Sequence, residues 1–443
     1  MKVLLVKCHK KTIFSMLEPI VTEPLELEYL SGLLKKLEVE HRIYDPLIEG
    51  GCFEKVFNTY KPDVLVLSGY ITAVNTIIRH SRYAKNKYPD VKVVVGGVHA
   101  EINYEDFFLD TIDFIVHADG VNTFAKLLQS SFSKEEAAKI TGIAFHDRVK
   151  WQINSKCETS LENLPLPNRS YFEKYKAKTK YLHYHPVALV RTALSCPFNC
   201  SFCYCKLLNK GTYSARSIQS VAEEITSINS EYIWIVDDSF LLDRGRVLEF
   251  IAEIKRQKIK KKFIAYSRVD FILGNEDIIE KLADIGFVEL IIGMEAVDDK
   301  KLKEFNKHYL ANDNLKSADI LAKYGIRLTA LFIVGIDFTF KDFRNLSRSL
   351  KQMKLDSYTF SIFTPLKGTE VYQNYQDQII RKDYADYAKY DFLHLVLRPS
   401  QMSPAFFYLN FYLLYLEQFF RSRYIRRFIW DRLKRILGSG GSR

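Results

Sequence analysis

Nine residues, SCPFNCSFC at positions 195–203, carry the strongest chemical signal in this sequence. They place Cys196, Cys200 and Cys203 in the spacing Cys-x3-Cys-x2-Cys, directly after the apolar run 187–192. Three thiolates in one short loop can bind three irons of a [4Fe–4S] cluster, which normally takes four cysteine ligands. The fourth iron would stay open to a small molecule, so the motif predicts a catalytic cluster rather than one that only transfers electrons.

The same spacing also occurs in structural zinc sites, where Cys205 could supply a fourth thiolate. Against zinc, Cys203 and Cys205 are separated by a single residue, whereas zinc sites usually use two separated pairs. The other cysteines, Cys8, Cys52 and Cys157, are scattered, so a disulfide framework is not expected. The cluster is favoured and implies the reducing cytosol. A zinc-stabilised scaffold is the alternative, which zinc without iron in a metal analysis would support.

The motif lies near the start of a segment, residues 187–370, in which apolar runs alternate with helical patterns. Six repeats of strand and helix, each of about 30 residues, predict a partial (β/α)6 barrel. In such barrels the chemistry lies at the carboxyl ends of the strands, and the cysteine motif follows the first strand. The expected strands are 187–192, 232–236, 263–266, 289–292, 328–334 and 357–363, and the clearest helices are 217–228, 246–257 and 314–324.

Residues 1–135 alternate in the same way and complete an α/β protein. Fully apolar strands separated by helices predict a parallel sheet covered on both faces, that is, a doubly wound Rossmann-like domain. The chain has no G-x-G-x-x-G and no P-loop, which argues against a dinucleotide or ATP. The expected strands are 3–6, 41–44, 64–67, 91–95 and 114–116. The residues at the ligand-binding strand ends are Ser68, Gly69 and Tyr70 after one strand and Gly96, Gly97 and His99 after another.

The remaining segments are expected to connect, cover or end these two domains. Residues 136–186 are expected to be a connector stiffened by Pro165 and Pro167, and residues 438–443 a remnant of an expression vector. Residues 371–437 are expected to be helical, and their longest apolar run, 406–416, is too short to span a bilayer. The basic end of this region could lie on an anionic membrane surface, or it could pack on the barrel with its basic face in solvent.

The distribution of charge argues against a nucleic-acid partner. The chain has 64 Lys and Arg against 53 Asp and Glu, a formal net charge of +11. Residues 421–437 alone hold seven Lys or Arg and one acidic residue, so the rest of the chain is close to balanced. This balance argues against a basic nucleic-acid binder. Together with the cysteine usage it leaves a cytoplasmic protein as the expectation, and the basic end adds peripheral contact with the inner membrane surface as a further hypothesis.

The cysteine motif at the opening of a half barrel resembles the radical S-adenosylmethionine (SAM) superfamily. The resemblance implies that Cys196, Cys200 and Cys203 bind the cluster, whose open iron chelates SAM and whose reduction cleaves SAM to a 5′-deoxyadenosyl radical. It also implies a set of SAM contacts at successive strand ends. These are Phe202 of the motif, Asp237 and Asp238 for the amino group, Ser267 and Arg268 for ribose and carboxylate, Glu295 for ribose, and the backbone around Val334 for adenine.

The first domain resembles the cobalamin-binding domain of the B12-dependent branch of that superfamily. The features that carry this resemblance are the stretches 24–30, 68–69, 96–99 and 118–120. It implies that Ser68, Gly69, Tyr70, Gly96, Gly97 and His99 line the corrin. The D-x-H-x-x-G motif of other B12 proteins is absent, because Leu47 occupies the histidine position between Asp45 and Gly50. Cobalamin would then bind without a protein imidazole.

The resemblance implies a cobalamin-dependent methylase that acts on an unactivated carbon of a natural product, lipid or peptide. It also implies an external one-electron reductant of the flavodoxin or ferredoxin type. A non-methylating enzyme of the same architecture, such as the cyclase of bacteriochlorophyll synthesis, remains the main alternative. An RNA methylthiotransferase is less favoured, because such enzymes carry three further cluster cysteines in the N-terminal domain, where this chain has only Cys8 and Cys52.

Overall fold

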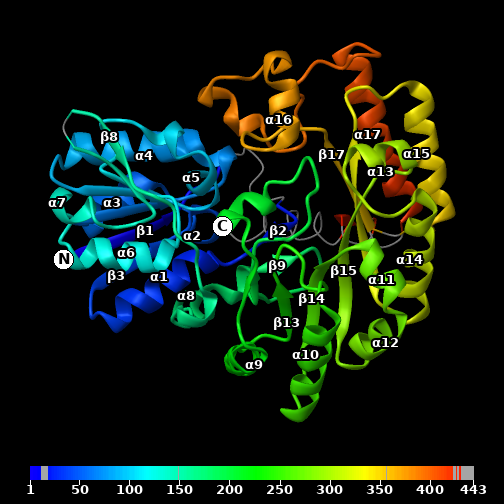
Figure 1. Cartoon of the computed structure of the whole chain (residues 1–443), viewed down its shortest axis with the longest axis horizontal. Helices are drawn as coiled ribbons and strands as arrows, with labels where there is room; N and C mark the ends of the chain where they lie inside the picture. Colours follow the sequence, from blue (N-terminus) through cyan, green and yellow to red (C-terminus); the bar gives the residue numbers. More distant parts are fainter. Residues whose placement is uncertain (11–17, 148, 356, 423–425, 427–428, 431–443) are drawn as a thin grey trace, which may run out of the picture.

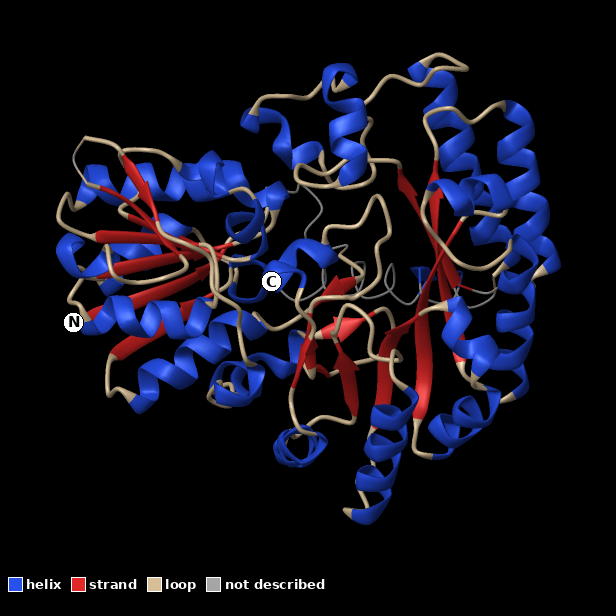
Figure 2. Ribbon diagram, in the orientation of Figure 1, coloured by secondary structure: helices blue, strands red, loops and turns tan. Residues whose placement is uncertain are grey.

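Two parallel sheets form the framework of the protein in a computed structural model (Figures 1 and 2). The structure describes residues 1–10, 18–147, 149–355, 357–422, 426 and 429–430. Helices cover both faces of the first sheet and the outer side of the second (Figure 2). The expected α/β class, with a Rossmann-like domain followed by a partial barrel, is confirmed.

The first sheet contains five parallel strands in the order β3-β1-β4-β5-β6. The first strand, β1, lies inside the sheet. The chain adds β3 on one side of β1 and then adds β4, β5 and β6 on the other side, all parallel to β1. A crevice therefore opens between the ends of β1 and β4, where doubly wound folds bind their ligands. The strands are β1 (Lys2–Lys7), β3 (Glu40–Tyr44), β4 (Val64–Ser68), β5 (Lys92–Gly96) and β6 (Phe114–Val116), and the main helices are α1 (Leu25–Lys36), α4 (Val74–Lys87) and α6 (Gly120–Gln129).

An antiparallel hairpin extends this sheet into the segment expected to be a connector. It consists of β7 (Ile143–His146) and β8 (Trp151–Ile153), and β7 pairs with β6. The side chains of β7 are buried up to His146, and the Asp147 carboxylate accepts the backbone N–H of Val149 and of Lys150 at the turn. The expected boundary at residue 136 is therefore corrected, since the sheet continues to residue 153.

The second sheet is the barrel, with six parallel strands in chain order. Alternate side chains face the interior, as Leu189 and Trp234 do, and pack there against Tyr29 of α1. Their neighbours pack outward under the helices. The strands are β10 (Val187–Val190), β13 (Tyr232–Ile235), β14 (Lys262–Ser267), β15 (Phe287–Glu295), β16 (Arg327–Val334) and β17 (Ser357–Ile362). The helices are α9 (Ile218–Ser227), α10 (Arg244–Arg256), α11 (Val269–Gly274), α12 (Glu276–Asp284), α13 (Asp299–Glu304), α14 (Ala311–Lys323) and α15 (Phe340–Gln352).

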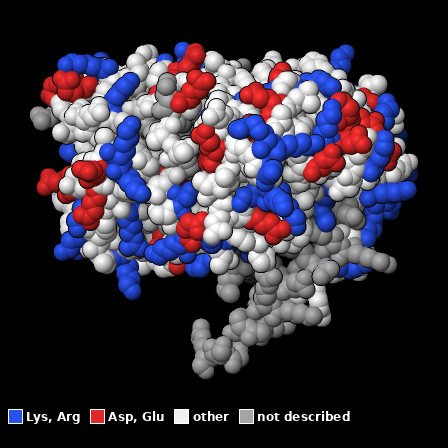
Figure 3. Space-filling view, turned by 90° about the horizontal axis from the view of Figure 1, so that it is seen from below, with Lys and Arg blue, Asp and Glu red and all other residues white. Residues whose placement is uncertain are grey.

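Helix α17 (Pro404–Arg421) covers β17, the last strand of the barrel. The Tyr415 hydroxyl donates to the Phe360 carbonyl at 2.9 Å, and Gln418 donates to the Tyr358 carbonyl at 2.8 Å. No helix in the described part of the chain is long and apolar enough to cross a membrane. Most of the basic stretch 421–437, and all of 438–443, lie outside the described residues. On the face shown in Figure 3, basic and acidic side chains are interspersed.

A buried arginine holds the two domains together. Arg169, in the segment between them, lies 2.9 Å from Glu23 and 3.3 Å from Glu28 on the first domain's side. Toward the barrel it pairs with Glu224 of α9 and donates to the Leu189 carbonyl at 2.8 Å. This charged hub therefore connects the first domain to the barrel.

Candidate active site between the two domains

The carboxyl-end edge of the first sheet meets the mouth of the barrel. Glu101, in the short helix after β5, accepts the backbone N–H of Asn209 at 2.6 Å, and Asn209 belongs to the loop that follows the cysteine motif. Tyr70, after β4, is an electrostatic neighbour of two residues at the barrel mouth: burial raises the pKa of Tyr266 and Tyr70 raises it further, and Tyr70 adds to the effect of Asp238 and Asp237 in raising the pKa of Arg191. The ligand-binding edges of both sheets therefore border one space.

The cysteine motif forms a loop that is tied to the barrel at several points. Cys200 is buried, Cys196 and Cys203 are partly exposed, and all three are free thiols. Ser195, directly before the motif, is buried with a φ of 66°, a left-handed conformation that non-glycine residues rarely adopt. The Ser201 hydroxyl donates to the Glu304 carbonyl at 3.0 Å and holds the middle of the loop.

Two cations lie beside the motif. The Arg268 guanidinium, over the ring of Phe198, donates to the Cys200 sulfur at 3.7 Å. Lys307 lies 3.0 Å from the Glu295 carboxylate and 5.7 Å from the centre of the Phe202 ring. Burial alone would lower the pKa of Lys307, but the Glu295 carboxylate raises it above its usual value. Positive charge here suits an anionic cluster or a ligand carboxylate.

The two carboxylates after β13 have different surroundings. Asp237 is buried, and its carboxylate accepts the backbone N–H of Thr192 at 2.6 Å and of Ala193 at 2.9 Å. It therefore holds the start of the cysteine loop, and its expected contact with SAM stays a prediction. One oxygen of Asp238 and the hydroxyl of Ser239 are buried without a hydrogen-bond partner among the described residues. Such unpaired acceptors suit a cationic ligand group, because buried polar atoms normally find partners.

The other predicted SAM residues lie around the same mouth. Ser267 is buried at the end of β14, and Glu295 ends β15 with a φ of 58°. The Val334 side chain is buried in the outer core, so only backbone at this position can face the mouth. A cavity of about 270 Å³ opens just beyond it, and Phe202 packs edge-on against its wall residue Phe305. The main apolar residues that line this cavity are Phe305, Ile333, Ile336, Phe338, Phe363 and Tyr375.

The edge of the first sheet presents fewer of the predicted residues than expected. Tyr70 and Gly97 are exposed there and Gly96 is partly exposed, whereas Ser68 and Gly69 are buried. A side chain on Gly97 would come within 2.8 Å of the Ser68 hydroxyl, so these residues pack the two strand ends together. His99 is buried and bonds to Asp106 at 2.9 Å. Its ring is therefore engaged by Asp106, and its expected contact with the corrin stays a prediction.

Two cations at the site were not among the residues predicted from the sequence. Lys7, at the end of β1, pairs with Glu26 of α1 and lies over the ring of Tyr70. Arg191, after β10, is partly exposed at the barrel mouth, and its guanidinium has no hydrogen-bond or ion-pair partner among the residues that the structure describes. Asp238 and Asp237 raise the pKa of Arg191 although its burial opposes this. A charged residue that continues an otherwise apolar strand is the signal that could have indicated Arg191.

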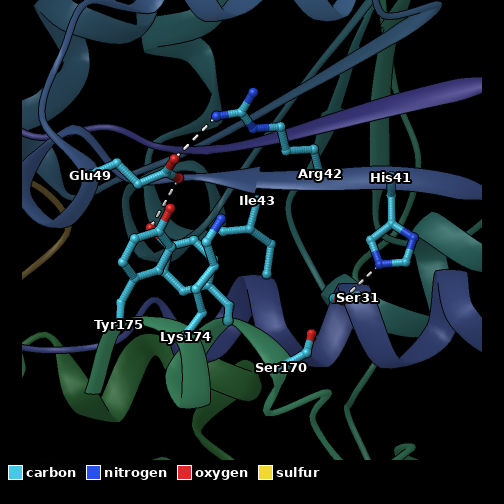
Figure 4. Close-up of a pocket in the computed structure, with 9 residues that line it drawn as sticks. Ser31, His41, Arg42, Ile43, Glu49, Ser170, Lys174 and Tyr175 are labelled. Carbon is cyan, nitrogen blue, oxygen red and sulfur yellow. Dashed lines mark hydrogen bonds and ion pairs between the residues drawn. The ribbon is translucent and has the colours of Figure 1, made fainter. Parts of the chain in front are cut away.

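A larger cavity of about 540 Å³ lies elsewhere, at the outer strand β3 (Figure 4). Its polar groups satisfy one another: Arg42 pairs with Glu49 at 3.1 Å, and His41 bonds to Ser31 at 2.7 Å. Because β3 is the edge strand of its sheet, this cavity is separated from the barrel mouth. We therefore take the space between the domains as the active site.

The donor set at the mouth fits an iron–sulfur cluster with SAM. It offers three free thiols on one loop, two adjacent cations, unpaired oxygen atoms and an apolar cavity. In the described part of the chain, no three His, Cys, Asp or Glu side chains are gathered closely enough to hold a metal ion, and this includes the three motif cysteines. The neighbouring Cys203, burial and Asp238 all raise the pKa of the Cys205 thiol.

Known proteins share both the domains and the fold of this chain. The hopanoid C-3 methylase of Methylococcus capsulatus is 25% identical over 87% of this chain and 74% of its own length. The anaerobic magnesium-protoporphyrin IX monomethyl ester cyclase of Rubrivivax gelatinosus is 24% identical over 86% and 70%. The structure of OxsB, a cobalamin-dependent SAM radical enzyme, superposes with a TM-score of 0.74 at 15% identity and covers 94% of this chain and 66% of that protein.

Two family matches cover the same two domains. Residues 190–350 match the radical SAM superfamily, and residues 20–128 match the B12 binding domain. The first match contains the three motif cysteines, and the second contains the strand ends at 68–70 and 96–97. The chain therefore belongs to the radical SAM superfamily, as an enzyme that carries a B12-binding domain before its barrel and uses a [4Fe–4S] cluster, SAM and cobalamin.

Proposed function

We propose that this enzyme methylates an unactivated carbon in a natural-product, lipid or peptide substrate. The observation that carries the proposal is the shared space between the domains, which the cysteine loop borders from one side and Tyr70 from the other. When bound, the cluster and SAM supply a 5′-deoxyadenosyl radical for hydrogen abstraction, and cobalamin supplies the methyl group. A substrate between them would have one carbon within reach of both.

Different residues at the barrel mouth would bind the cluster, SAM and cobalamin. We assign cluster binding to Cys196, Cys200 and Cys203. Asp238 would accept hydrogen bonds from the SAM amino group, while the Arg268 guanidinium would neutralise the SAM carboxylate or the cluster. Phe202, Ser267, Glu295 and the backbone beyond Val334 would hold the adenosyl part. On the opposite side, Tyr70, Gly96 and Gly97 would face the corrin.

The barrel interior suggests the character of the substrate. Its partly exposed side chains include Tyr266 and Leu331, with Trp234 beneath them, so an apolar or aromatic body would fit. Arg191 at the rim could bind one anionic or carbonyl group of that body. The reductant would be a small electron carrier of the flavodoxin or ferredoxin type. Peripheral membrane contact by the basic end of the chain is also part of this proposal.

Cyclisation without methyl transfer is the second candidate, because a relative at 24% identity is a cyclase. The two functions differ in their products. Methylation consumes SAM in two ways, so anaerobic turnover with cobalamin should release both S-adenosylhomocysteine and 5′-deoxyadenosine. 5′-Deoxyadenosine alone, in the presence of retained cobalamin and a converted substrate, would overturn the methylase proposal in favour of the cyclase type.

The adjacent carboxylates after β13 allow a paired test of the SAM site. We expect Asp238→Asn to raise the KM for SAM about 10-fold to 100-fold, because a charge-assisted hydrogen bond contributes about 1.5–3 kcal/mol. The unfolding temperature should change little, since Asp238 has a buried oxygen without a partner. Asp237→Asn should instead lower the unfolding temperature, because one carboxylate oxygen accepts the two backbone N–H groups and the other accepts the Thr192 hydroxyl, and the neutral amide keeps only one of these oxygens.

Steady-state 5′-deoxyadenosine formation against SAM concentration, together with thermal unfolding of the reconstituted variants, checks this pair. If Asp237→Asn raised the KM for SAM more than Asp238→Asn did, the assignment of the two carboxylates would be reversed.

A further inference from the structure

Helix α17 exposes an apolar face on its outer side. Its inner side is buried against the barrel through Phe407, Phe411 and Leu414. Six large side chains on the other side are each between 47% and 64% exposed, and their spacing of three or four residues places them on one face. These residues, which we call the α17 stripe, are Phe406, Leu409, Tyr412, Leu413, Leu416 and Phe420.

The α17 stripe contains no charged side chain. The acidic residue of the helix, Glu417, turns toward α15, where it accepts from Ser347 at 2.6 Å and pairs with Lys351 at 2.7 Å. Scattered exposed apolar residues are ordinary on a protein surface, but a contiguous stripe along about four turns of a helix marks an interaction site.

Basic side chains flank the stripe. Helix α15 lies beside α17 on the outside of the barrel (Figure 1) and contacts it along its length. Four exposed cations on α15 recur at helical spacing, and Phe340 at the start of that helix is itself 50% exposed. The four are Lys341, Arg344, Arg348 and Lys351.

The chain also becomes strongly basic directly after the stripe. Residues 421–437 hold seven Lys or Arg against one Asp. Arg421 donates to the Leu350 carbonyl at 3.2 Å, which places the start of this stretch at the end of α15. The apolar face is therefore bordered by positive charge along one side and at its end.

We propose that the α17 stripe and the α15 cations together dock on the surface of an anionic lipid bilayer. The apolar side chains would enter the region between headgroups and acyl chains, and each cation near an anionic surface contributes about 1 kcal/mol. Burial of the stripe adds the apolar term, about 25 cal/mol per Å² of area removed from water. A helix that lies in the interface needs no membrane-spanning length.

Charge argues against the other occupants of this face. A second copy of the chain bound stripe to stripe would bring two sets of α15 cations and two basic ends together, and their repulsion would oppose the contact. A nucleic acid would match the cations but would leave the apolar stripe in water. The proposal does not rest on methyl transfer, because it concerns a surface on the outside of the barrel.

Vesicle flotation of the full-length protein tests the proposal. We expect it to float with vesicles of phosphatidylcholine and phosphatidylglycerol, to bind phosphatidylcholine alone much less, and to lose binding in high salt. The double variant Leu409→Glu/Leu413→Glu should lower the partition coefficient about tenfold or more, since it places two charges in the stripe. Ile153→Glu, an equally exposed position on β8, is the matched control and should bind as the wild type does.

Charge reversal of Arg344 and Arg348 measures the electrostatic contribution to vesicle binding separately from the apolar contribution of the α17 stripe. These variants should lose the preference for anionic vesicles while keeping the wild-type unfolding temperature and monomer mass. Equal binding of wild type and double variant would overturn the proposal. A wild-type dimer that Leu409→Glu/Leu413→Glu dissociates would also overturn it and assign the stripe to a second copy. Product formation from a water-soluble substrate should be unchanged in these variants. This activity assay separates the membrane proposal from the methylase proposal, because each can then fail on its own.

Discussion

Replacement of Cys200 by alanine is expected to abolish the cleavage of SAM. Cys200 is the buried member of the three motif cysteines, and the Arg268 guanidinium contacts its sulfur. With two thiolates left, the loop cannot hold three irons, and a cluster normally takes at least the three ligands that the motif provides. We expect iron in the reconstituted protein to fall from about four per chain to a small fraction of that, and 5′-deoxyadenosine formation to fall more than about 100-fold. Cys196→Ala and Cys203→Ala should behave in the same way.

Cys205→Ala is the control that makes this result specific. Cys205 is a free, partly exposed thiol two residues after Cys203, so it is the first candidate for an additional ligand. If the three motif cysteines alone bind the cluster, Cys205→Ala keeps about four irons and the iron–sulfur absorption band. Loss of all metal in Cys205→Ala, with zinc rather than iron in the wild type, would restore the four-thiolate zinc alternative.

The strands of both sheets were predictable because most of them are short, largely apolar runs between helical patterns. The runs at 64–67 and 357–363 correspond to β4 and β17 within one or two residues. The hairpin at 143–153 was not predictable in the same way. Its second strand, β8, is only partly buried, and the pairing of its first strand, β7, with β6 depends on a sheet edge that only the folded domain provides.

The candidate site was predictable where chemistry imposes a spacing along the chain, as for the three motif cysteines. It was not predictable where orientation decides the role. Asp237 and Asp238 are identical neighbours in sequence, but adjacent residues after a strand point to opposite sides, and only Asp237 reaches the backbone of the cysteine loop. A single basic residue such as Lys307 is usually a surface group, so its burial beside Glu295 could be found only in the fold.

Replacement of Arg169 by leucine is expected to destabilise the protein strongly. The Arg169 side chain is 14% exposed and faces Glu23, Glu28 and Glu224, which are almost completely buried. Arg216 remains to pair with Glu224, but the other two carboxylates would lose their cation. Removal of one partner from a buried ion pair typically costs about 3–5 kcal/mol, because the remaining charge stays buried. Arg244→Leu is the control: its pair with Asp277 is half exposed, and we expect a loss of less than about 1 kcal/mol.

The pH dependence of this loss distinguishes an uncompensated charge from a simple packing defect. Burial and the neighbouring Glu23 raise the pKa of Glu28 in the folded protein, and Arg169 opposes that rise, so the Arg169→Leu variant should raise it further. A carboxyl whose pKa is raised by folding stabilises the fold while it is protonated and loses that contribution as the pH rises through the folded-state pKa. The loss of unfolding free energy relative to wild type should therefore be larger at about pH 8 than at about pH 5.5, as measured by urea unfolding at both values. A loss that is the same at both pH values would mean that missing contacts, and not the buried carboxylates, destabilise the variant. In that case the hub would join the domains by packing alone.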